Sequence, residues 1–415
     1  MRAIQLLCLA SAAAAVQKPL QSVPDLCSRQ PLFSTEITCH LSDDDRQPPP
    51  SSSHPTAKKP KAPIVQSSPP SKWEATGQCA GTYCIFKNPG FANGRGMVAI
   101  TTAQNIKKLK ALDKKSVKGS AKEEQQPFTI AEVPGKGLGL IANGPLHRGD
   151  TVMRKTPAIL VHRAFFEQTP PEVQSPLLKS AVSFLPASLR DAFAAQMSHF
   201  PGDRLLSILA TNSFQMDLGG RDGHHYGNFP EVSRFNHDCR PNVAFRIDQA
   251  TLTHVTTAVR DVKPGEELSI SYLDSLEPRA KRQERARAAW GFECTCSHCS
   301  LPEKEIKKSD KRLEEIKGIE AKLGDLSSRG VSKKMLQRLV KLYEEERLQA
   351  NLGGMYTLVA MNYNMLGDAK MAGKYAKLAV EAVEIENGVG QPDGEAMKEL
   401  SRDPKSHFTW KGRIG

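Results

Sequence analysis

The sequence predicts an α+β protein with a mostly β centre and an all-α C-terminal region. Between residues 128 and 275, short apolar runs rich in β-branched residues alternate with turns that contain Gly and Pro, which is typical of strands. From residue 301 onward, Ala, Leu, Tyr and Val recur at helical spacing. Because 415 residues exceed the size of an ordinary single domain, we expect more than one.

The mostly β centre is expected to consist of short strands interrupted by a helical insertion. Pro134 and Gly135 separate the first two strands and predict a hairpin. The insertion covers residues 163–215, where Pro170 and Pro171 open one helix. The strands are expected at residues 128–133, 138–142, 151–160 with Pro157 inside, 243–247, 252–258 and 268–272.

The C-terminal region, residues 301–415, is expected to be a helical domain. Residues 355–365 and 369–385 are predicted to form two helices joined at 366–368. A helix pair of this length is similar to the unit of tetratricopeptide arrays. One clear pair indicates a helical bundle more firmly than an array, so we expect a helical, tetratricopeptide-like domain.

The first 127 residues differ in composition from the rest. Residues 1–17 have a basic start, an apolar stretch and small residues before position 16, which are features of a signal peptide. Residues 18–127 are basic and rich in Pro, Ser and Lys, so we expect a largely disordered leader with a small ordered patch near 79–102. If the signal is used, four cysteines could pair in an oxidising compartment. They are Cys27, Cys39, Cys79 and Cys84.

The net charge of +12 lies mainly in this leader. Residues 1–127 carry +8, whereas residues 128–300 carry +1. A nucleic-acid-binding domain would need clustered basic and aromatic residues on its folded part, so we expect no direct nucleic-acid contact. Beyond the extreme N-terminus, no apolar run reaches the roughly 18 residues of a spanning helix, which excludes a multi-pass membrane protein. We therefore expect its partners to be proteins rather than nucleic acids or membranes. We also expect the chain to be a monomer.

Three cysteines in the segment 294–299 (CTCSHC) indicate a metal site. Structural zinc takes four sulfur or nitrogen ligands in tetrahedral geometry. Cys239 and His298 are the candidates for the fourth ligand, and we favour Cys239 because His298 lies between two close ligands. Free or disulfide-bonded thiols are the alternative to a metal. The expected zinc ligands are Cys239, Cys294, Cys296 and Cys299.

Three further motifs are weak singly and informative together. Gly137 and Gly139 are alternate glycines that let a backbone approach a ligand closely. His237 and Asp238 could suggest a hydrolase, but the sequence contains no Gly-x-Ser-x-Gly elbow. The motifs are the segments 134–142 (PGKGLGLIA), 234–242 (RFNHDCRPN) and 265–272 (GEELSISY).

Together with the cysteine segment, these motifs resemble those of the SET-domain protein lysine methyltransferases. The family's Gly-x-Gly, Arg-Phe-x-Asn-His-x-Cys-x-Pro-Asn, Gly-Glu-Glu-Leu-x-x-x-Tyr and Cys-x-Cys-x-x-Cys elements occur in the same order, the second one residue shorter. The resemblance covers about residues 128–300. It implies a SET domain with a pseudo-knot at 128–275 and a post-SET zinc segment at 276–300. Asp238 stands where serine is commonest, and no MYND-type zinc finger interrupts 162–212.

The resemblance implies S-adenosylmethionine as the methyl donor and a protein lysine, histone or other, as the acceptor. Tyr272 would orient the amine beside the transferred methyl group, and Phe292 would stack on the adenine. Tyr226 would line the lysine channel, with a core tyrosine as the alternative. The implied cofactor-binding residues are Lys136, Gly137, Leu138, Gly139, Arg234, Asn236, His237, Tyr272 and Phe292, and the implied catalytic residues are Tyr272 and Tyr226.

A non-enzymatic scaffold is the alternative from another functional class. In that case the SET fold would serve as a binding module, and the C-terminal helices would dock a protein partner. The presence of Tyr272 and of the alternate glycines favours the enzyme. The resemblance implies the nucleus or cytoplasm, whereas the signal-like start suggests the secretory route.

Overall fold

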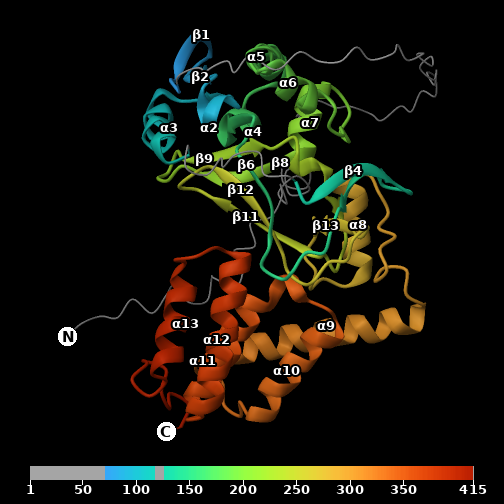
Figure 1. Ribbon diagram of the computed structural model, residues 1–415, viewed down its shortest axis with the longest axis vertical. Coiled ribbons are helices and arrows are strands. Elements are labelled where there is room, and N and C mark those ends of the chain that lie inside the picture. Colours follow the sequence, from blue (N-terminus) through green and yellow to red (C-terminus); the bar gives the residue numbers. More distant parts are fainter. Residues whose placement is uncertain (1–70, 117–125, 415) are drawn as a thin grey trace.

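The computed structural model describes residues 71–116 and 126–414, so the predicted signal peptide at 1–17 lies outside the described residues. The described residues form a β-rich half and a helical half (Figure 1). The predicted α+β class is therefore confirmed. Within these ranges, no helix combines the length and the apolar character that crossing a bilayer requires.

The largest sheet of the β-rich half has six strands and joins distant segments of the chain. β3 (Met97–Thr101) runs parallel to β7 (Ile159–His162), with Val98 opposite Ile159. Ile85, Val98 and Ile159 are buried in one hydrophobic core, which explains why these segments share a sheet. The other strands of this sheet are β1 (Glu74–Ala80), β2 (Tyr83–Asn88), β8 (Ser213–Asp217) and β9 (His224–Asn228), and the spatial order is β1-β2-β3-β7-β9-β8.

Ordered structure before residue 128 is more extensive than the sequence indicated. We expected only a small ordered patch near 79–102, but residues 74–101 supply three strands of the six-stranded sheet. The apolar residues of β2 and β3 favour strands, but local spacing gives no sign of the distant strand β7 that pairs with β3. Cys79 and Cys84 form a disulfide across the hairpin of β1 and β2. Cys27 and Cys39 lie outside the described residues.

The strand predicted at 151–160 is in fact two strands in different sheets. β6 (Thr151–Lys155) belongs to a three-stranded sheet, whereas β7 belongs to the six-stranded one. Pro157 lies between them and has no backbone N–H to donate to a ladder, so one strand cannot run through it. The single-strand prediction was therefore wrong. The three-stranded sheet contains β11 (Val243–Asp248), β12 (Thr253–Ala258) and β6, in that order.

The four-stranded sheet brings three of the sequence motifs together. β10 (Asn236–His237) runs parallel to β13 (Glu267–Ile270). β13 pairs antiparallel with β5 (Gly137–Ala142), which forms the predicted hairpin with β4 (Phe128–Val133). The alternate glycines, the Asn-His segment and the strand that precedes Tyr272 therefore meet in one sheet.

Four helices occupy the insertion predicted at residues 163–215. Asp203 caps the last of them, because its side chain accepts hydrogen bonds from the backbone N–H groups of Leu205 and Leu206. The apolar faces of the helices pack in the same core as the six-stranded sheet. These helices are α4 (Arg163–Gln168), α5 (Pro171–Ser183), α6 (Ala187–Ala194) and α7 (Arg204–Asn212), and two others, α2 (Phe91–Gly94) and α3 (Ala103–Ser116), flank the N-terminal strands.

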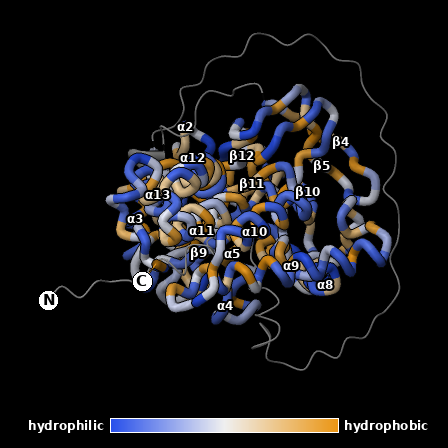
Figure 2. Tube along the Cα trace, turned by 90° about the horizontal axis from the view of Figure 1, so that it is seen from below, coloured by the Kyte–Doolittle hydropathy of each residue, from blue (hydrophilic) through white to orange (hydrophobic). Residues whose placement is uncertain are grey.

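The helical half contains the predicted helix pair. α11 (Leu352–Met365) and α12 (Ala369–Glu386) pack against each other and are joined at residues 366–368. Hydrophilic and hydrophobic residues alternate along α9 (Glu303–Gly324), because only one face of this helix is buried (Figure 2). The tetratricopeptide-like character stays a prediction. The other elements are α8 (Arg279–Trp290), α10 (Lys333–Glu345), α13 (Pro392–Arg402) and two 3₁₀ segments, Val232–Arg234 and Gln349–Asn351.

We predict that Leu160→Ala destabilises the protein. Leu160 is fully buried on β7 in the interior of the six-stranded sheet, and removing a buried leucine side chain costs about 2–5 kcal/mol. Urea unfolding of the full chain, followed by circular dichroism, measures the change. Ile130→Ala is the matched control, because Ile130 is 57% exposed and its loss should cost under about 0.5 kcal/mol. Equal effects of the two substitutions would contradict the assigned sheet order.

Candidate active site and metal centre

A cavity of about 770 Å³ lies where the motifs meet. Its walls come from the Gly-rich turn before β5, the loop between α6 and α7, β10, the end of β13, and residues 290–296 after α8. This volume falls within the range of small-molecule sites, about 300–1,000 Å³. The sequence-predicted residues that line it are Lys136, Gly137, Leu138, Arg234, Asn236, His237, Tyr272 and Phe292.

Glu267 holds two of the predicted binding residues in place. Its carboxylate accepts a hydrogen bond of 2.6 Å from Lys136 Nζ and one of 3.0 Å from Asn236 Nδ2. Asn236 Nδ2 also lies 3.4 Å from the Leu138 carbonyl oxygen. One carboxylate at the start of β13 thus links the Gly-rich turn to the Asn-His segment. Glu267 lies in the 265–272 motif, but no role was predicted for it.

Gly139 does not line the cavity, but it permits the close approach of its walls. A Cβ atom at this position would lie 2.6 Å from Val133 Cγ2 and 2.8 Å from Asn236 Nδ2. Both distances are shorter than van der Waals contact, so any side chain here would displace Asn236. Gly139 therefore acts on the predicted cofactor site through Asn236.

His237 connects the cavity to the cysteine cluster. Its Nδ1 accepts a hydrogen bond of 3.0 Å from the backbone N–H of Tyr272. The proton of the neutral ring is therefore on Nε2, which donates to Cys239 Sγ at 3.3 Å. Burial lowers the pKa of His237 to about 3, so the ring is neutral at physiological pH. The imidazole is thus a fixed bridge between the sulfur and the strand end that carries Tyr272.

Tyr272 lies among aromatic rings at the cavity wall. Its hydroxyl donates a hydrogen bond of 2.5 Å to the Phe235 carbonyl oxygen. The centroid of its ring is 5.3 Å from that of Trp290 and 6.2 Å from that of Phe292. Burial and then the Glu267 carboxylate raise the pKa of Tyr272 above its usual value, so the phenol stays protonated. Trp290, the last residue of α8, lies four residues before Cys294 and was not among the predicted site residues.

The four predicted metal ligands form a buried cluster beside the cavity. Cys239 Sγ lies 3.9 Å from Cys294 Sγ and 3.5 Å from Cys299 Sγ. With Cys296, all four sulfurs lie within 4.8 Å of one another. Sulfurs bound at about 2.3 Å to one tetrahedral zinc ion would be about 3.8 Å apart, whereas a disulfide needs about 2.05 Å. The donor set therefore fits a zinc ion and does not fit a disulfide.

The charged groups around the cluster fit a metal–thiolate centre. One zinc ion with four thiolates carries a net charge of about −2. The guanidinium of Arg282 is almost fully buried, with Nη2 3.9 Å from Cys299 Sγ, and offsets part of that charge. His298, the alternative fourth ligand, lies instead with Nε2 3.0 Å from Arg240 Nη2.

Comparison with known proteins identifies one domain of the chain. Residues 137–273 match the family model described as SET domain. The chain therefore contains a SET domain. It is 28% identical over 298 residues to the histone-lysine N-methyltransferase set5 of Schizosaccharomyces pombe, which covers 70% of this chain and 88% of that protein.

Two human relatives match the SET region over shorter stretches. N-lysine methyltransferase SMYD2 is 33% identical over 129 residues, or 30% of this chain and 29% of that protein. Histone-lysine N-methyltransferase SMYD3 is 35% identical over 104 residues, or 22% of this chain and 24% of that protein. The chain therefore spans most of the yeast relative and about a quarter of the human ones. The predicted resemblance to the SET-domain protein lysine methyltransferases is confirmed.

Tyr226, predicted to line a lysine channel, lies in a hydrophobic core of the SET domain. Its ring is almost fully buried on β9 and packs against Phe166, with centroids 5.7 Å apart. Its hydroxyl donates a hydrogen bond of 2.5 Å to Glu167 Oε1. Tyr226 does not line the 770 Å³ cavity. Tyr226 therefore occupies the position of a core tyrosine, which was the alternative expectation.

The SET cavity has one wall that the sequence analysis missed. Residues 195–198 between α6 and α7 line the cavity. Arg234 Nη2 donates to the Ala195 carbonyl oxygen at 3.3 Å, and Asn212 Nδ2 donates to the Met197 carbonyl oxygen at 2.7 Å. Arg234 therefore holds the wall through its backbone. No sequence motif marks this loop, because the hydrogen bonds from Arg234 and Asn212 go to its main-chain carbonyl oxygens and not to its side chains.

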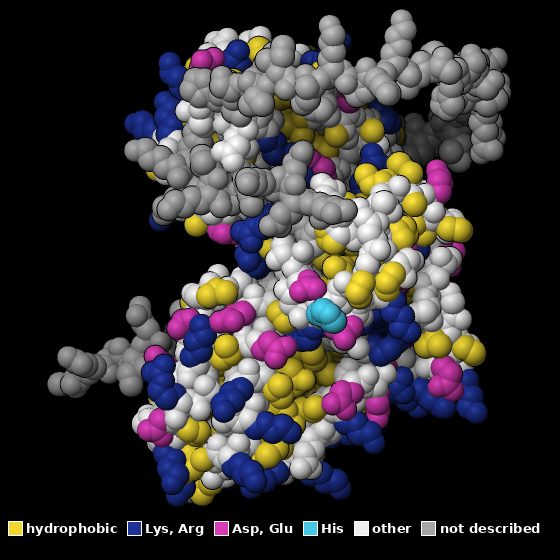
Figure 3. Space-filling model, viewed as in Figure 1, with side chains coloured by type: hydrophobic (Ala, Val, Ile, Leu, Met, Phe, Trp, Pro, Cys, Tyr) yellow, Lys and Arg dark blue, Asp and Glu magenta, His cyan; other side chains and the backbone are white. Residues whose placement is uncertain are grey.

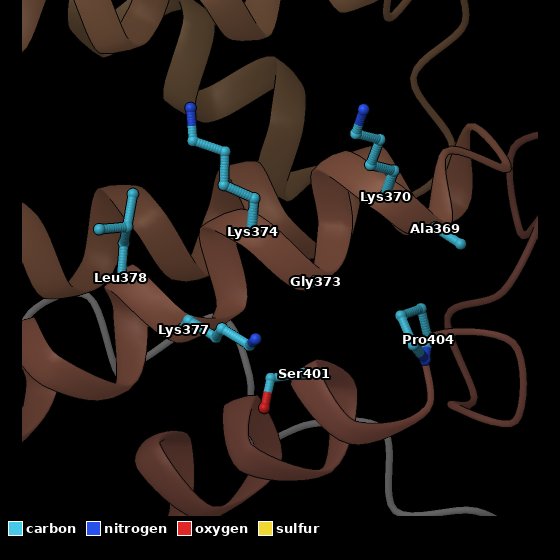
Figure 4. A pocket seen from close by; sticks show the side chains of 8 residues that line it. All are labelled: Ala369, Lys370, Gly373, Lys374, Lys377, Leu378, Ser401 and Pro404. Carbon is cyan, nitrogen blue, oxygen red and sulfur yellow. The ribbon is translucent and has the colours of Figure 1, made fainter.

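A second cavity lies on the C-terminal helices, away from the SET motifs. Lys370 and Lys374 project from one side of α12, and Lys377 extends toward Ser401 of α13 (Figure 4). Lys and Arg side chains, with Asp and Glu between them, also cover the visible face of the helical half (Figure 3). The protein partner expected on these helices stays a prediction, and this lysine-lined groove is where it can be sought.

We predict that Gly139→Ala weakens cofactor binding without unfolding the SET domain. The new methyl group would push Asn236 away from Leu138 and Glu267, so we expect the affinity for S-adenosylmethionine to fall about tenfold or more. Calorimetric titration measures the affinity. Gly144→Ala is the control, because a Cβ there meets no atom within 4 Å. An unchanged affinity in Gly139→Ala would contradict a role for Asn236.

Proposed function

We propose that this SET-domain protein transfers a methyl group from S-adenosylmethionine to a lysine side chain of a protein substrate. The observation that carries the proposal is one cavity lined by the Gly-rich turn, by Asn236 and His237, and by Tyr272. The relatives named as histone-lysine and N-lysine methyltransferases support the same reaction class. We also propose the SET domain at 128–275 and the post-SET segment at 276–300 as units of this chain.

The cavity residues fit S-adenosylmethionine. Lys136 lines the cavity with its Nζ 2.6 Å from the Glu267 carboxylate, and this cation suits the carboxylate at the amino-acid end of the cofactor. Phe292 offers a ring face for an adenine, at the end of the cavity near the cysteine cluster. When bound, the cofactor supplies a methyl group on a positively charged sulfur, ready for displacement by an amine.

The protein's own contribution is to position the amine and to keep it neutral. A lysine that enters surroundings formed by Tyr272, Trp290 and Phe292 loses hydration, which lowers the pKa of its ammonium group. Tyr272 donates its proton to the Phe235 carbonyl, so its oxygen keeps lone pairs that can accept a hydrogen bond from the amine. Because the phenol stays protonated, Tyr272 orients the amine rather than acting as its base. Orientation in a closed site supplies a large part of the rate in such transfers.

We predict that Tyr272→Phe lowers the rate of methyl transfer about 100-fold or more, because the orienting oxygen is lost. The affinity for S-adenosylmethionine should stay within about threefold. Transfer of labelled methyl groups to histones and to proteins of a cell extract measures the rate. Tyr356→Phe, on α11 outside the cavity lining, is the control. If the wild-type protein binds the cofactor and labels nothing, the non-enzymatic scaffold becomes the better proposal.

We also predict about one zinc ion per chain, held by Cys239, Cys294, Cys296 and Cys299. Cys296→Ser removes one of four ligands, so zinc content should drop and the segment after α8 should become sensitive to proteases. Elemental analysis and limited proteolysis measure these changes. Ser300→Ala, beside the cluster but without a metal ligand, should keep its zinc. A stable wild-type protein without metal would contradict the zinc proposal.

A further inference from the structure

Glu346 is a buried carboxylate at the boundary between the helical half and the SET domain. It follows α10, and its side chain is 0% exposed. An isolated charge at such a position would be strongly destabilising, so its partners matter. Those partners come from both sides of the boundary.

On the SET side, Glu346 holds Arg240, the residue after the zinc ligand Cys239. Arg240 Nη2 donates to Glu346 Oε2 at 2.8 Å, and Arg240 Nε donates to the Glu346 carbonyl oxygen. The Arg240 side chain is 2% exposed. One guanidinium is thus bound at two points by a single residue of the helical half.

On the helical side, α9 supplies further donors to the same carboxylate. Ser309 Oγ donates to Glu346 Oε2 at 2.7 Å, and Arg312 Nε donates to Glu346 Oε1 at 2.6 Å. Both carboxylate oxygens of Glu346 therefore accept hydrogen bonds from α9. These bonds fix its side chain independently of Arg240. Nearby Glu345 contrasts with it, because its carboxylate is 33% exposed and pairs with surface cations.

From Arg240 a chain of hydrogen bonds leads to the methyl-transfer cavity. Arg240 Nη1 donates to the Cys239 carbonyl oxygen at 2.8 Å. Cys239 Sγ accepts from His237 Nε2, and His237 Nδ1 accepts from the N–H of Tyr272. Groups that orient metal ligands are worth about 10- to 100-fold in metal affinity or activity. Glu346 is well placed to act through this chain, since Arg240 holds the backbone of Cys239.

We infer that Glu346 is a positioning residue of the metal centre, through which the C-terminal helices support the cavity wall that carries the cysteines. This inference rests on the proposed zinc site. It concerns zinc retention, which can be measured without methyl transfer, so it can fail or stand independently of the proposed activity.

The test compares zinc release from full-length variants into an excess of a chromogenic chelator. Glu346→Gln keeps the shape and removes the charge, and we expect zinc release about tenfold or more faster than in the wild type, with a parallel loss of S-adenosylmethionine affinity. Glu345→Gln is the matched control and should stay within about twofold. A wild-type release rate in Glu346→Gln would overturn the inference, and a wild-type protein without zinc would overturn it together with the zinc proposal.

A second variant separates positioning from general stability. Arg240→Met combined with Glu346→Leu replaces the buried pair by apolar side chains, which often preserves or raises stability. We expect zinc release to stay rapid, because nothing then holds the Cys239 carbonyl, whereas thermal stability should exceed that of Glu346→Gln even though Ser309 and Arg312 lose their acceptor. Recovery of zinc retention along with stability would overturn the inference. If either variant fails to fold, Ser309→Ala is the deciding test. We expect it to release zinc several-fold faster than the wild type, and an unchanged release rate would overturn the inference.

Discussion

The cysteine cluster is the constraint on which the cavity depends. Cys239 belongs to the loop after β10, whereas Cys294, Cys296 and Cys299 follow α8, so one centre joins two distant segments. His237 bridges a sulfur of this centre to the strand end that bears Tyr272. Phe292, between α8 and the first of these cysteines, is thereby held at the cavity wall. The geometry of the proposed metal centre and the geometry of the proposed methyl-transfer site therefore depend on each other.

The second half of the molecule enters the same arrangement through charge. The proposed zinc centre with its four thiolates would concentrate negative charge in the interior, and the buried guanidiniums of Arg240 and Arg282 would offset part of it. Glu346 in turn compensates Arg240. Negative, positive and negative groups thus alternate from the proposed metal centre to Arg240 and then to Glu346 in the helical half. This order of charges favours one relative placement of the two halves over others.

The sequence predicted the parts of the site that depend on local spacing, and missed those that depend on tertiary packing. The segment 294–299, the alternate glycines and Asn236 were found because each lies in a short contiguous motif, and Cys239 was chosen as the remaining cysteine of the central region. The wall at 195–198 and the first strand at 74–80 were not found, and the sequence left two alternatives for Tyr226, because each depends on a partner that lies elsewhere in the chain. The split at Pro157 is the exception, since the missing N–H was visible in the sequence.

The parallel pairing of β10 with β13 has a consequence for the order in which this protein matures during its synthesis. The ribosome delivers the Gly-rich turn first, the Asn-His segment about a hundred residues later, and the last cysteine later still. The cavity cannot close until all three have emerged, and Glu346 comes after them. A nascent chain stopped before the C-terminal helices would contain all four cysteines and every residue that lines the cavity, but Arg240 would lack its carboxylate partner, which makes such a chain more prone to misfold.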